Sequence, residues 1–319
     1  MTKSIFSKFL PLLMFCGVLT FMTSCDNDDD DVMTNDPKSI VEIAQETDDF
    51  SILVDALIKA DLVTTINNGT YTVFAPTNAA FNQFFQDMNA SGLDDFSKEE
   101  LAPILLYHVV GGEVRSTGLS SGYVGTASLG PNDQPIKLKV DVGTDVRLDN
   151  DSKVETPDVA ATNGVIHIIN KVLTPPNVVD IALENDNFSI LVQALTRSDL
   201  DFDFVGFLSG DGPFTVFAPT NDAFATLLND NPDWDTLDDI DKATLDAVLK
   251  YHVISGNNFE STSLSNGTSV PTAKGDNITI NTTNGVTVTD ANGGVATVEL
   301  PDVQGINGVV HVINRVLLP

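Results

Sequence analysis

The feature that most constrains this chain is an internal repeat. Four segments recur in the same order, with separations that grow from 138 to 144 residues. The repeated segments are 48–54 with 186–192, 72–78 with 215–221, 107–109 with 251–253, and 163–170 with 307–314. A period this long indicates two homologous domains, each large enough to fold alone, and not a solenoid of small units. We therefore expect domains at residues 37–175 and 176–319.

Within one repeat, helical patterns come before strand patterns. Residues 50–58 place apolar side chains at helical spacing, and Ser97 with Glu100 forms a capping box ahead of a further helix. Residues 71–75 and 136–142 have the composition and alternation of strands, and residues 165–173 form a long apolar run that predicts another strand. This order predicts an α+β domain in which a helical layer is attached to a β-sandwich.

The composition excludes several classes of function. The chain carries 45 acidic and 16 basic residues, a formal net charge of -29. Nucleic-acid binding requires Lys and Arg to replace condensed counterions, so we expect no nucleic-acid partner. The only two cysteines, Cys16 and Cys25, lie before the repeats. The body of the protein therefore has no disulfide framework, cysteine-ligated zinc or cysteine nucleophile.

The first 24 residues have the pattern of a signal peptide. Lys3 and Lys8 precede a short apolar run over residues 9–22, which is too short for a comfortable membrane span. Residues 22–25, Met-Thr-Ser-Cys, resemble a bacterial lipobox, although leucine is usual at the first of these positions. The resemblance implies that Cys25 is acylated and becomes the first residue of the mature chain. Plain secretion with cleavage nearby is the alternative.

An acidic run follows Cys25 directly, in the segment 25–36. Residues 26–31 are Asp-Asn-Asp-Asp-Asp-Asp, which lacks the spacing and the glycine of a calcium loop and is typical of a solvated spacer. Acidic residues at this position resemble the export signal of Bacteroidetes-type surface lipoproteins. We therefore expect a bacterial outer-membrane lipoprotein that is lipid-anchored and exposed at the cell surface.

Two further boxes carry a resemblance to a known family. Residues 72–81 and 215–224 share the motif Thr-Val-Phe-Ala-Pro-Thr-Asn-x-Ala-Phe. Residues 163–175 and 307–319 share a second motif, Asn-Gly-Val-x-His-x-Ile-Asn-x-Val-Leu-x-Pro. With the Tyr-His pairs between them, these boxes resemble the fasciclin domain in both repeats. The resemblance implies a wedge-like β-sandwich with a helical layer, and a role in extracellular adhesion to proteins, receptors or polysaccharides.

The resemblance also suggests candidate binding residues. The Tyr-His region is associated with integrin-mediated adhesion in animal members, which makes candidates of Tyr107, His108, Tyr251 and His252. A histidine on an apolar face is more commonly a buried, hydrogen-bonded residue, and that alternative stays open for all four histidines. The second repeat also carries a five-residue insertion with the aromatic residues Phe202, Phe204 and Phe207. These side chains either pack on their own domain or form an exposed contact patch.

The two functional hypotheses are both binding functions. The first is a surface-anchored adhesion protein in which two domains add avidity. The alternative is a carbohydrate- or small-ligand-binding lipoprotein for nutrient capture, which the single tryptophan, Trp234, and four tyrosines disfavour. We expect no enzyme, because the sequence has no Gly-x-Ser-x-Gly elbow and no phosphate-binding glycine loop. Each repeat supplies only two histidines and no cysteine, so we expect no metal and no cofactor.

Overall fold

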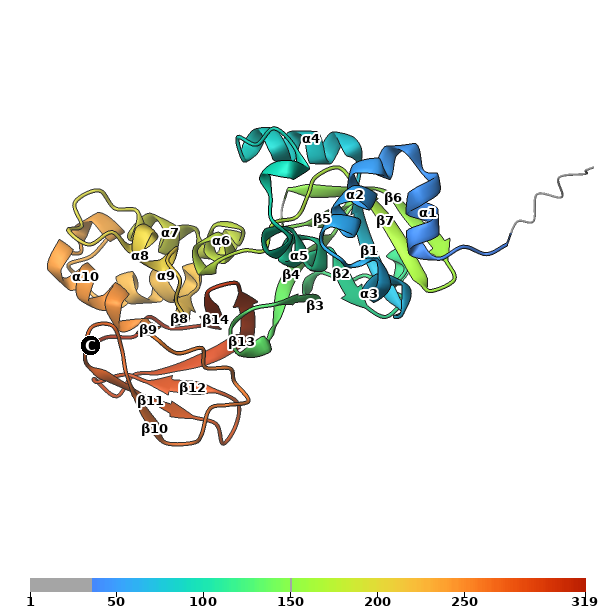
Figure 1. Cartoon of the computed structure of the whole chain (residues 1–319). Helices are drawn as coiled ribbons and strands as arrows, with labels where there is room; N and C mark the ends of the chain where they lie inside the picture. Colours follow the sequence, from blue (N-terminus) through green and yellow to red (C-terminus); the bar gives the residue numbers. More distant parts are fainter. Residues whose placement is uncertain (1–35, 150) are drawn as a thin grey trace, which may run out of the picture. The chain divides into compact units, whose positions relative to one another are not determined.

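The computed structural model describes residues 36–149 and 151–319 (Figure 1). The expected signal peptide, Cys25 and the acidic run lie outside these residues. Both repeats fall within a single unit, from Pro37 to Pro319. Among the helices of the described residues, none combines the length and the apolar character needed to cross a membrane.

The first repeat begins with helices and ends with strands, as the sequence predicts. Its helices are α1 (Ile40–Glu46), α2 (Ser51–Lys59), α3 (Val63–Asn67), α4 (Asn78–Asp87) and α5 (Lys98–Tyr107). Its strands are β1 (Tyr71–Pro76), β2 (Val109–Gly111), β3 (Gly122–Leu129), β4 (Pro135–Val142), β5 (Val146–Leu148), β6 (Ser152–Ala161) and β7 (Gly164–Ile169).

Side-chain caps set the helix starts. Ser97 accepts a hydrogen bond from Glu100 N–H and the Glu100 carboxylate accepts one from Ser97 N–H, which confirms the predicted capping box. Thr77 caps α4 through Ala80 N–H at 3.3 Å. Each cap satisfies N–H groups that have no partner inside the helix.

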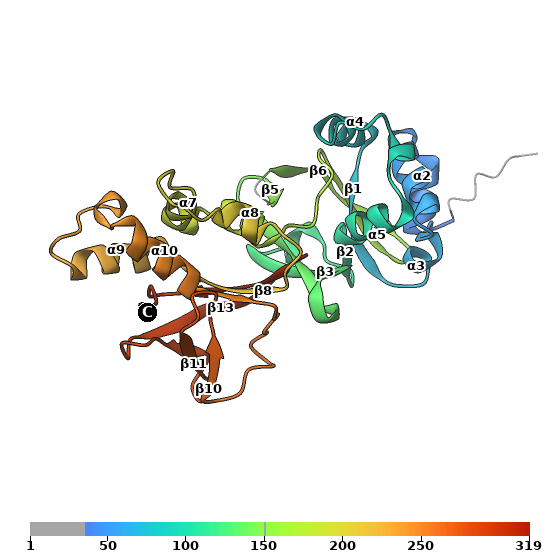
Figure 2. The same cartoon turned by 60° about the vertical axis from the view of Figure 1, so that its left-hand side comes forward.

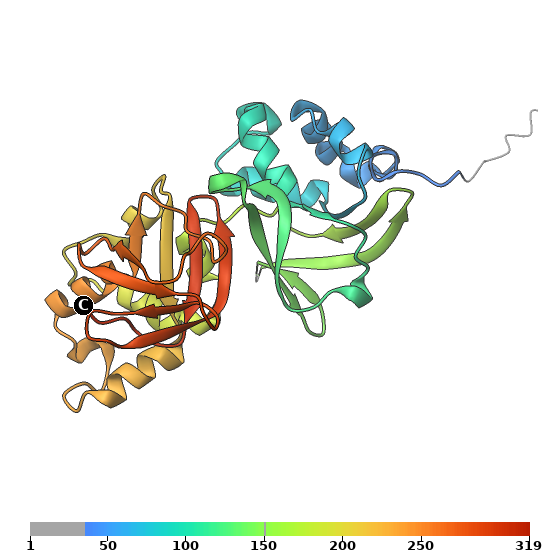
Figure 3. The same cartoon turned by 90° about the horizontal axis from the view of Figure 1, so that it is seen from below.

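The strands of the first repeat form a closed barrel in the order β1 to β7, visible in the view from below (Figure 3). Strands β1 and β7 run parallel, and the other neighbours are antiparallel. The strand predicted over 165–173 ends earlier, at Ile169. Asn170 exchanges hydrogen bonds with the backbone of Lys153, which turns the chain away from the ladder.

The second repeat has the same element order. Its helices are α6 (Val178–Leu183), α7 (Ser189–Leu195), α8 (Phe204–Leu208), α9 (Asn221–Asp230) and α10 (Lys242–Tyr251). Its strands are β8 (Phe214–Pro219), β9 (Val253–Ser255), β10 (Thr268–Pro271), β11 (Asn277–Asn281), β12 (Thr287–Thr289), β13 (Val295–Gly305) and β14 (Gly308–Ile313). Helices α7 to α10 lie on one side of this sheet (Figures 1 and 2).

The strands of the second repeat form an open sheet, in the order β10-β11-β12-β13-β14-β8-β9. In the first repeat, the pair Val110 and Thr126 joins β2 to β3. In the second repeat, Val253 O of β9 accepts a single hydrogen bond from Ala273 N–H at 2.7 Å, just beyond the end of β10.

Each repeat has two apolar cores, one on each side of its central strands. In β1, Val73 and Ala75 pack with the helices, whereas Phe74 between them points to the barrel interior with Leu138 and Ile169. The second repeat divides its core in the same way. Successive side chains of a strand point to opposite faces, so each central strand packs against the helices on one face and against the β core on the other.

Candidate interaction site

The Asn-Gly boxes hold three parts of each repeat together. Asn163 accepts a hydrogen bond from Ile40 N–H at 2.8 Å and donates to Ile66 O at 2.8 Å, while its own carbonyl accepts from Tyr71 N–H at 3.1 Å. Asn307 repeats the arrangement in the second repeat, with Val178, Leu208 and Phe214 as partners. This repeated asparagine therefore fixes the first helix against the central strands.

The four residues of the two Tyr-His pairs are all buried. His108 ends α5, with its Nδ1 2.8 Å from Ile104 O and its Nε2 2.9 Å from Leu173 N. A carbonyl can only accept and an amide N–H can only donate, so Nδ1 carries the proton and Nε2 accepts. His252 has the same geometry, to Val248 O at 2.7 Å and Leu317 N at 2.9 Å.

The tyrosines of these pairs point to the other core. Tyr107 lies inside the barrel, and its hydroxyl is 3.1 Å from Lys137 O and 3.0 Å from the Asp149 carboxylate. Burial raises the pKa of Tyr107 well above its ordinary value, and the nearby Asp149 charge adds to the effect. Tyr251 donates to Asn277 O at 2.8 Å. In the described structure, these candidate side chains therefore connect layers of their own repeat and offer no exposed surface to a partner.

Burial keeps His108 and His252 neutral. It lowers the pKa of both imidazoles from 6.5 to about 4, against the opposing effect of the backbone carbonyl that each one contacts. The folded-state pKa lies below the unfolded one, so the contribution to stability is complete above pH 6.5 and is lost as the pH falls towards 4. The loss is about 3 kcal/mol per histidine.

The tautomer and the low pKa can be tested directly. We expect the imidazole signals of His108 and His252 in proton–carbon NMR spectra of residues 37–319 to keep neutral shifts from pH 7 down to about pH 5. A short peptide with the sequence of residues 104–112 is the control, and its histidine should titrate near its ordinary pKa. Titration of either folded histidine near pH 6.5 would contradict the buried, neutral state.

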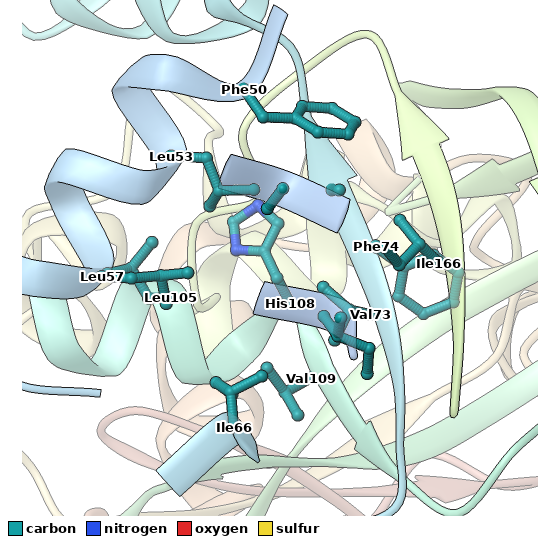
Figure 4. Close-up of a pocket in the computed structure, with 13 residues that line it drawn as sticks. Phe50, Leu53, Leu57, Ile66, Val73, Phe74, Leu105, His108, Val109 and Ile166 are labelled. Carbon is teal, nitrogen blue, oxygen red and sulfur yellow. The ribbon is translucent and has the colours of Figure 1, made fainter. Parts of the chain in front are cut away.

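A small apolar cavity lies beside each of these histidines. In the first repeat its volume is about 20 Å³, between helices α2 and α5 and strand β1 (Figure 4). Leu53, Leu57 and Leu105 line it together with the His108 ring. The second repeat has an equivalent cavity of about 30 Å³ beside His252. Such a volume holds about one water molecule, and an apolar lining leaves that water few partners.

A second polar cluster recurs in both repeats, and the sequence analysis did not find it. At a bulge in β6, Asp158 has φ of +64° and accepts from Ser116 N–H at 2.7 Å. Asp158 N–H donates to His167 Nδ1, and His167 Nε2 donates to Val114 O at 3.0 Å. Ser261, Asp302 and His311 repeat the cluster. Because the serine donates to the aspartate, and the histidine bonds only backbone groups, the cluster is not a nucleophile–base relay.

The aromatic insertion packs mainly on its own repeat. Phe204 is buried in α8, and Phe202 and Phe207 are half-buried. Phe202 meets Phe204 edge-on at 4.8 Å between ring centroids and Phe207 at 5.3 Å, and Lys250 Nζ lies 4.4 Å above its ring. The apolar groups of the insertion that a partner could touch are therefore the exposed Val205 and the half-buried Phe202 and Phe207.

Titratable groups do not form a metal site here. Within residues 36–149 and 151–319, no three His, Cys, Asp or Glu side chains are grouped so as to hold a metal ion. All four histidines already use both ring nitrogens in bonds to backbone atoms. A metal would have to displace these bonds to reach an imidazole.

The model of the fasciclin domain matches the chain twice, over residues 48–175 and 186–319. The chain belongs to the fasciclin family. Human periostin is 30% identical over 261 residues, which cover 79% of this chain and 28% of periostin. Protein sll1483 of Synechocystis is 41% identical over 144 residues, which cover 45% of this chain and 77% of that protein. The fasciclin chain described here thus spans less than a third of the length of periostin.

A solved structure is also similar. It is a FAS1 domain pair from the insect cell adhesion molecule fasciclin I, at 22% identity and a TM-score of 0.49, covering 83% of this chain and 95% of that one. The boxes that identify the family are the same segments that position the buried asparagines and histidines. The sequence boxes typical of the family therefore serve mainly to maintain the fold.

Proposed function

We propose that this fasciclin protein is a surface-anchored interaction protein that binds extracellular protein or polysaccharide partners through its two domains. The observation that carries the proposal is the state of the repeated boxes, whose histidines are buried and bonded to backbone atoms. Groups in this state are poor catalysts, because neither ring nitrogen is available to a substrate. Recognition then falls to the exposed loops and strand faces, and two copies allow avidity.

The candidate residues take different roles in this proposal. The two Tyr-His pairs do not touch a partner. Tyr107 and His108 position the strand that follows them, as Tyr251 and His252 do in the second repeat, and they affect binding only in this way. The half-buried Phe202 and Phe207 supply an accessible apolar contact in the second repeat, and the buried Phe204 packs edge-on against Phe202. Loss of binding on substitution of a Tyr-His pair would then follow from loss of folded protein.

The anchor belongs to the same proposal. Cys25 is the attachment point of a lipid in the outer membrane, with residues 26–36 as the spacer to the first domain and the cell surface as the final location. Cys25→Ala should release the protein into the medium or leave it unprocessed, whereas the matched Cys16→Ala, inside the apolar run, should leave anchoring intact. Mass spectrometry of the mature amino terminus should detect the lipid attached to Cys25. An unmodified terminus at another residue would favour plain secretion.

The partner class is tested with residues 26–319 on arrays of matrix proteins and glycans, beside each domain alone. Binding that weakens when the domains are separated supports a bivalent adhesion protein. Phe202→Ser with Phe207→Ser should reduce binding if the aromatic insertion contributes, and the exposed Leu300→Ser serves as a surface control. If only glycans bind and one domain is sufficient, the protein functions in ligand capture instead.

A further inference from the structure

A polar cluster links the two repeats close to their connecting segment. Lys139 in β4 donates from its Nζ to the backbone oxygen of Glu184, the residue directly after α6, at 2.8 Å. Tyr123 of β3 packs against the apolar core of the second repeat. A polar cavity of about 140 Å³ is lined by Asp149 and Thr174 on one side and Glu184 on the other. The two repeats therefore share one partly enclosed polar space.

Asp149 is held in this space by its own repeat. It follows β5 with φ of +46°, and its carboxylate accepts hydrogen bonds from Lys139 N–H at 3.0 Å and from the Tyr107 hydroxyl at 3.0 Å. Burial nevertheless raises the pKa of Asp149 to about 7, because the bonds and the Lys139 charge do not compensate fully for lost solvation.

Glu184 brings a second carboxylate from the other repeat. Burial raises the pKa of Glu184 to about 8, and the charges of Asp149 and Asp180 raise it further against the effect of Lys139. The other charged and titratable groups around the cluster are Asp141, at 3.2 Å from Lys139 Nζ, Tyr123, and the paired Lys171 and Asp151 at the cavity wall. Negative charge thus exceeds positive charge around this partly enclosed space.

We propose that this cluster is a proton-controlled contact between the two domains: Asp149 and Glu184 together retain a proton while the domains are docked, and its release weakens the docking. One proton removes the repulsion between the two carboxylates, and Lys139, which also pairs with Asp141, offsets part of the remaining charge. A second contact between the domains runs from Asn132 Nδ2 to Asn258 O at 3.1 Å. Near it, burial raises the pKa of Glu260, and the Lys137 charge from the first domain opposes that rise.

The direction of the pKa shifts determines how docking of the two domains depends on pH. The groups that shift the pKa of Asp149 belong to its own repeat, whereas the Asp149 charge raises the pKa of Glu184 across the contact. The docked state therefore binds more protons at Glu184 between about pH 4 and 8. The contact is therefore strongest at the acid end of that window and weakens as the pH rises through 7 to 8. This dependence is independent of any partner and does not rest on the proposed adhesive function.

Carboxyl carbon NMR of residues 37–319 tests the coupling. Asp149 should titrate well above 4 in the parent protein, and Glu184→Gln should lower its midpoint by about one pH unit, because one repelling charge is gone. Glu155→Gln, at an exposed carboxyl in β6, is the matched control and should change nothing. An Asp149 midpoint near 4 in the parent, or one that Glu184→Gln does not move, would overturn the proposal.

The mechanical consequence needs a separate measurement. The segment 37–319 has no cysteine, so dyes can be placed by Asp94→Cys in the first domain and Asp238→Cys in the second, both exposed. Energy transfer should change between pH 6 and 9 with a midpoint between 7 and 8, and Glu184→Gln should remove that change. A flat profile in the parent, or the same midpoint in Glu184→Gln, would sink the idea. Glu184 is only partly buried, so glutamine should not prevent folding.

Discussion

Gly164→Ala is expected to destabilise the first domain by at least about 3 kcal/mol. Gly164 lies directly beside Tyr71 in the parallel pairing of β7 with β1, and a Cβ atom there would be 1.8 Å from Tyr71 O. Tyr71 O is a backbone atom, and it can move away only if the hydrogen bonds between β1 and β7 break. Its φ of +143° is also unfavourable for alanine. Alanine should therefore break the junction at which the Asn-Gly box begins.

The single tryptophan makes this prediction specific to one domain. Trp234 lies in the second domain, so its fluorescence follows that domain alone, while circular dichroism follows both. In urea titrations of residues 37–319, Gly164→Ala should lower the circular dichroism midpoint of the first domain and leave the Trp234 transition nearly in place. Gly111→Ala in β2, where a Cβ has no neighbour within 4 Å, is the matched control. Equal stability of the two variants would contradict the close approach of β7 to β1.

Local signals allowed much of the fold to be predicted. The repeat fixes the duplication, and the α+β order, the cap at Ser97 and the strand around Ile136 follow from periodicity and capping chemistry. The end of β7 was not predictable, because Asn170 turns the chain through a bond to Lys153 that no spacing rule reveals. Similarly, the closed barrel of one repeat and the open sheet of the other were not predictable, because the segments between His108 and Asn163 and between His252 and Asn307 have the same length.

The site was less accessible from sequence for a physical reason. Tyr and His have an apolar body and a polar end, so a Tyr-His pair has the same pattern whether it faces a partner or a core. The deciding contacts join residues far apart in sequence, such as His108 with Leu173 and Asp158 with Ser116. The contact of Lys139 with Glu184 joins two domains, and neither residue belongs to a repeated box.

His108→Leu should destabilise the first domain by about 3 kcal/mol, with little change in the second. Leucine keeps most of the volume but leaves the buried Leu173 N–H without an acceptor and removes the donor to Ile104 O. Each buried group left without a partner costs about 1 to 3 kcal/mol. Urea titration followed by circular dichroism and by Trp234 fluorescence separates the two domains, and His252→Leu should give the opposite pattern.

The same variants distinguish a structural histidine from one that contacts a partner. If His108 supports the fold, His108→Leu should lower the free energy of unfolding. Its binding to a partner should then decrease only in proportion to the unfolded fraction. His108→Gln, which can still donate or accept, should lose less, and Glu113→Gln on the nearby surface should lose nothing measurable. His108→Leu should also weaken the acid dependence of stability between pH 6.5 and 4, because it removes one group that must become protonated on unfolding. Full stability together with lost binding would instead make the imidazole a direct contact, and would require α5 to open before a partner could reach it.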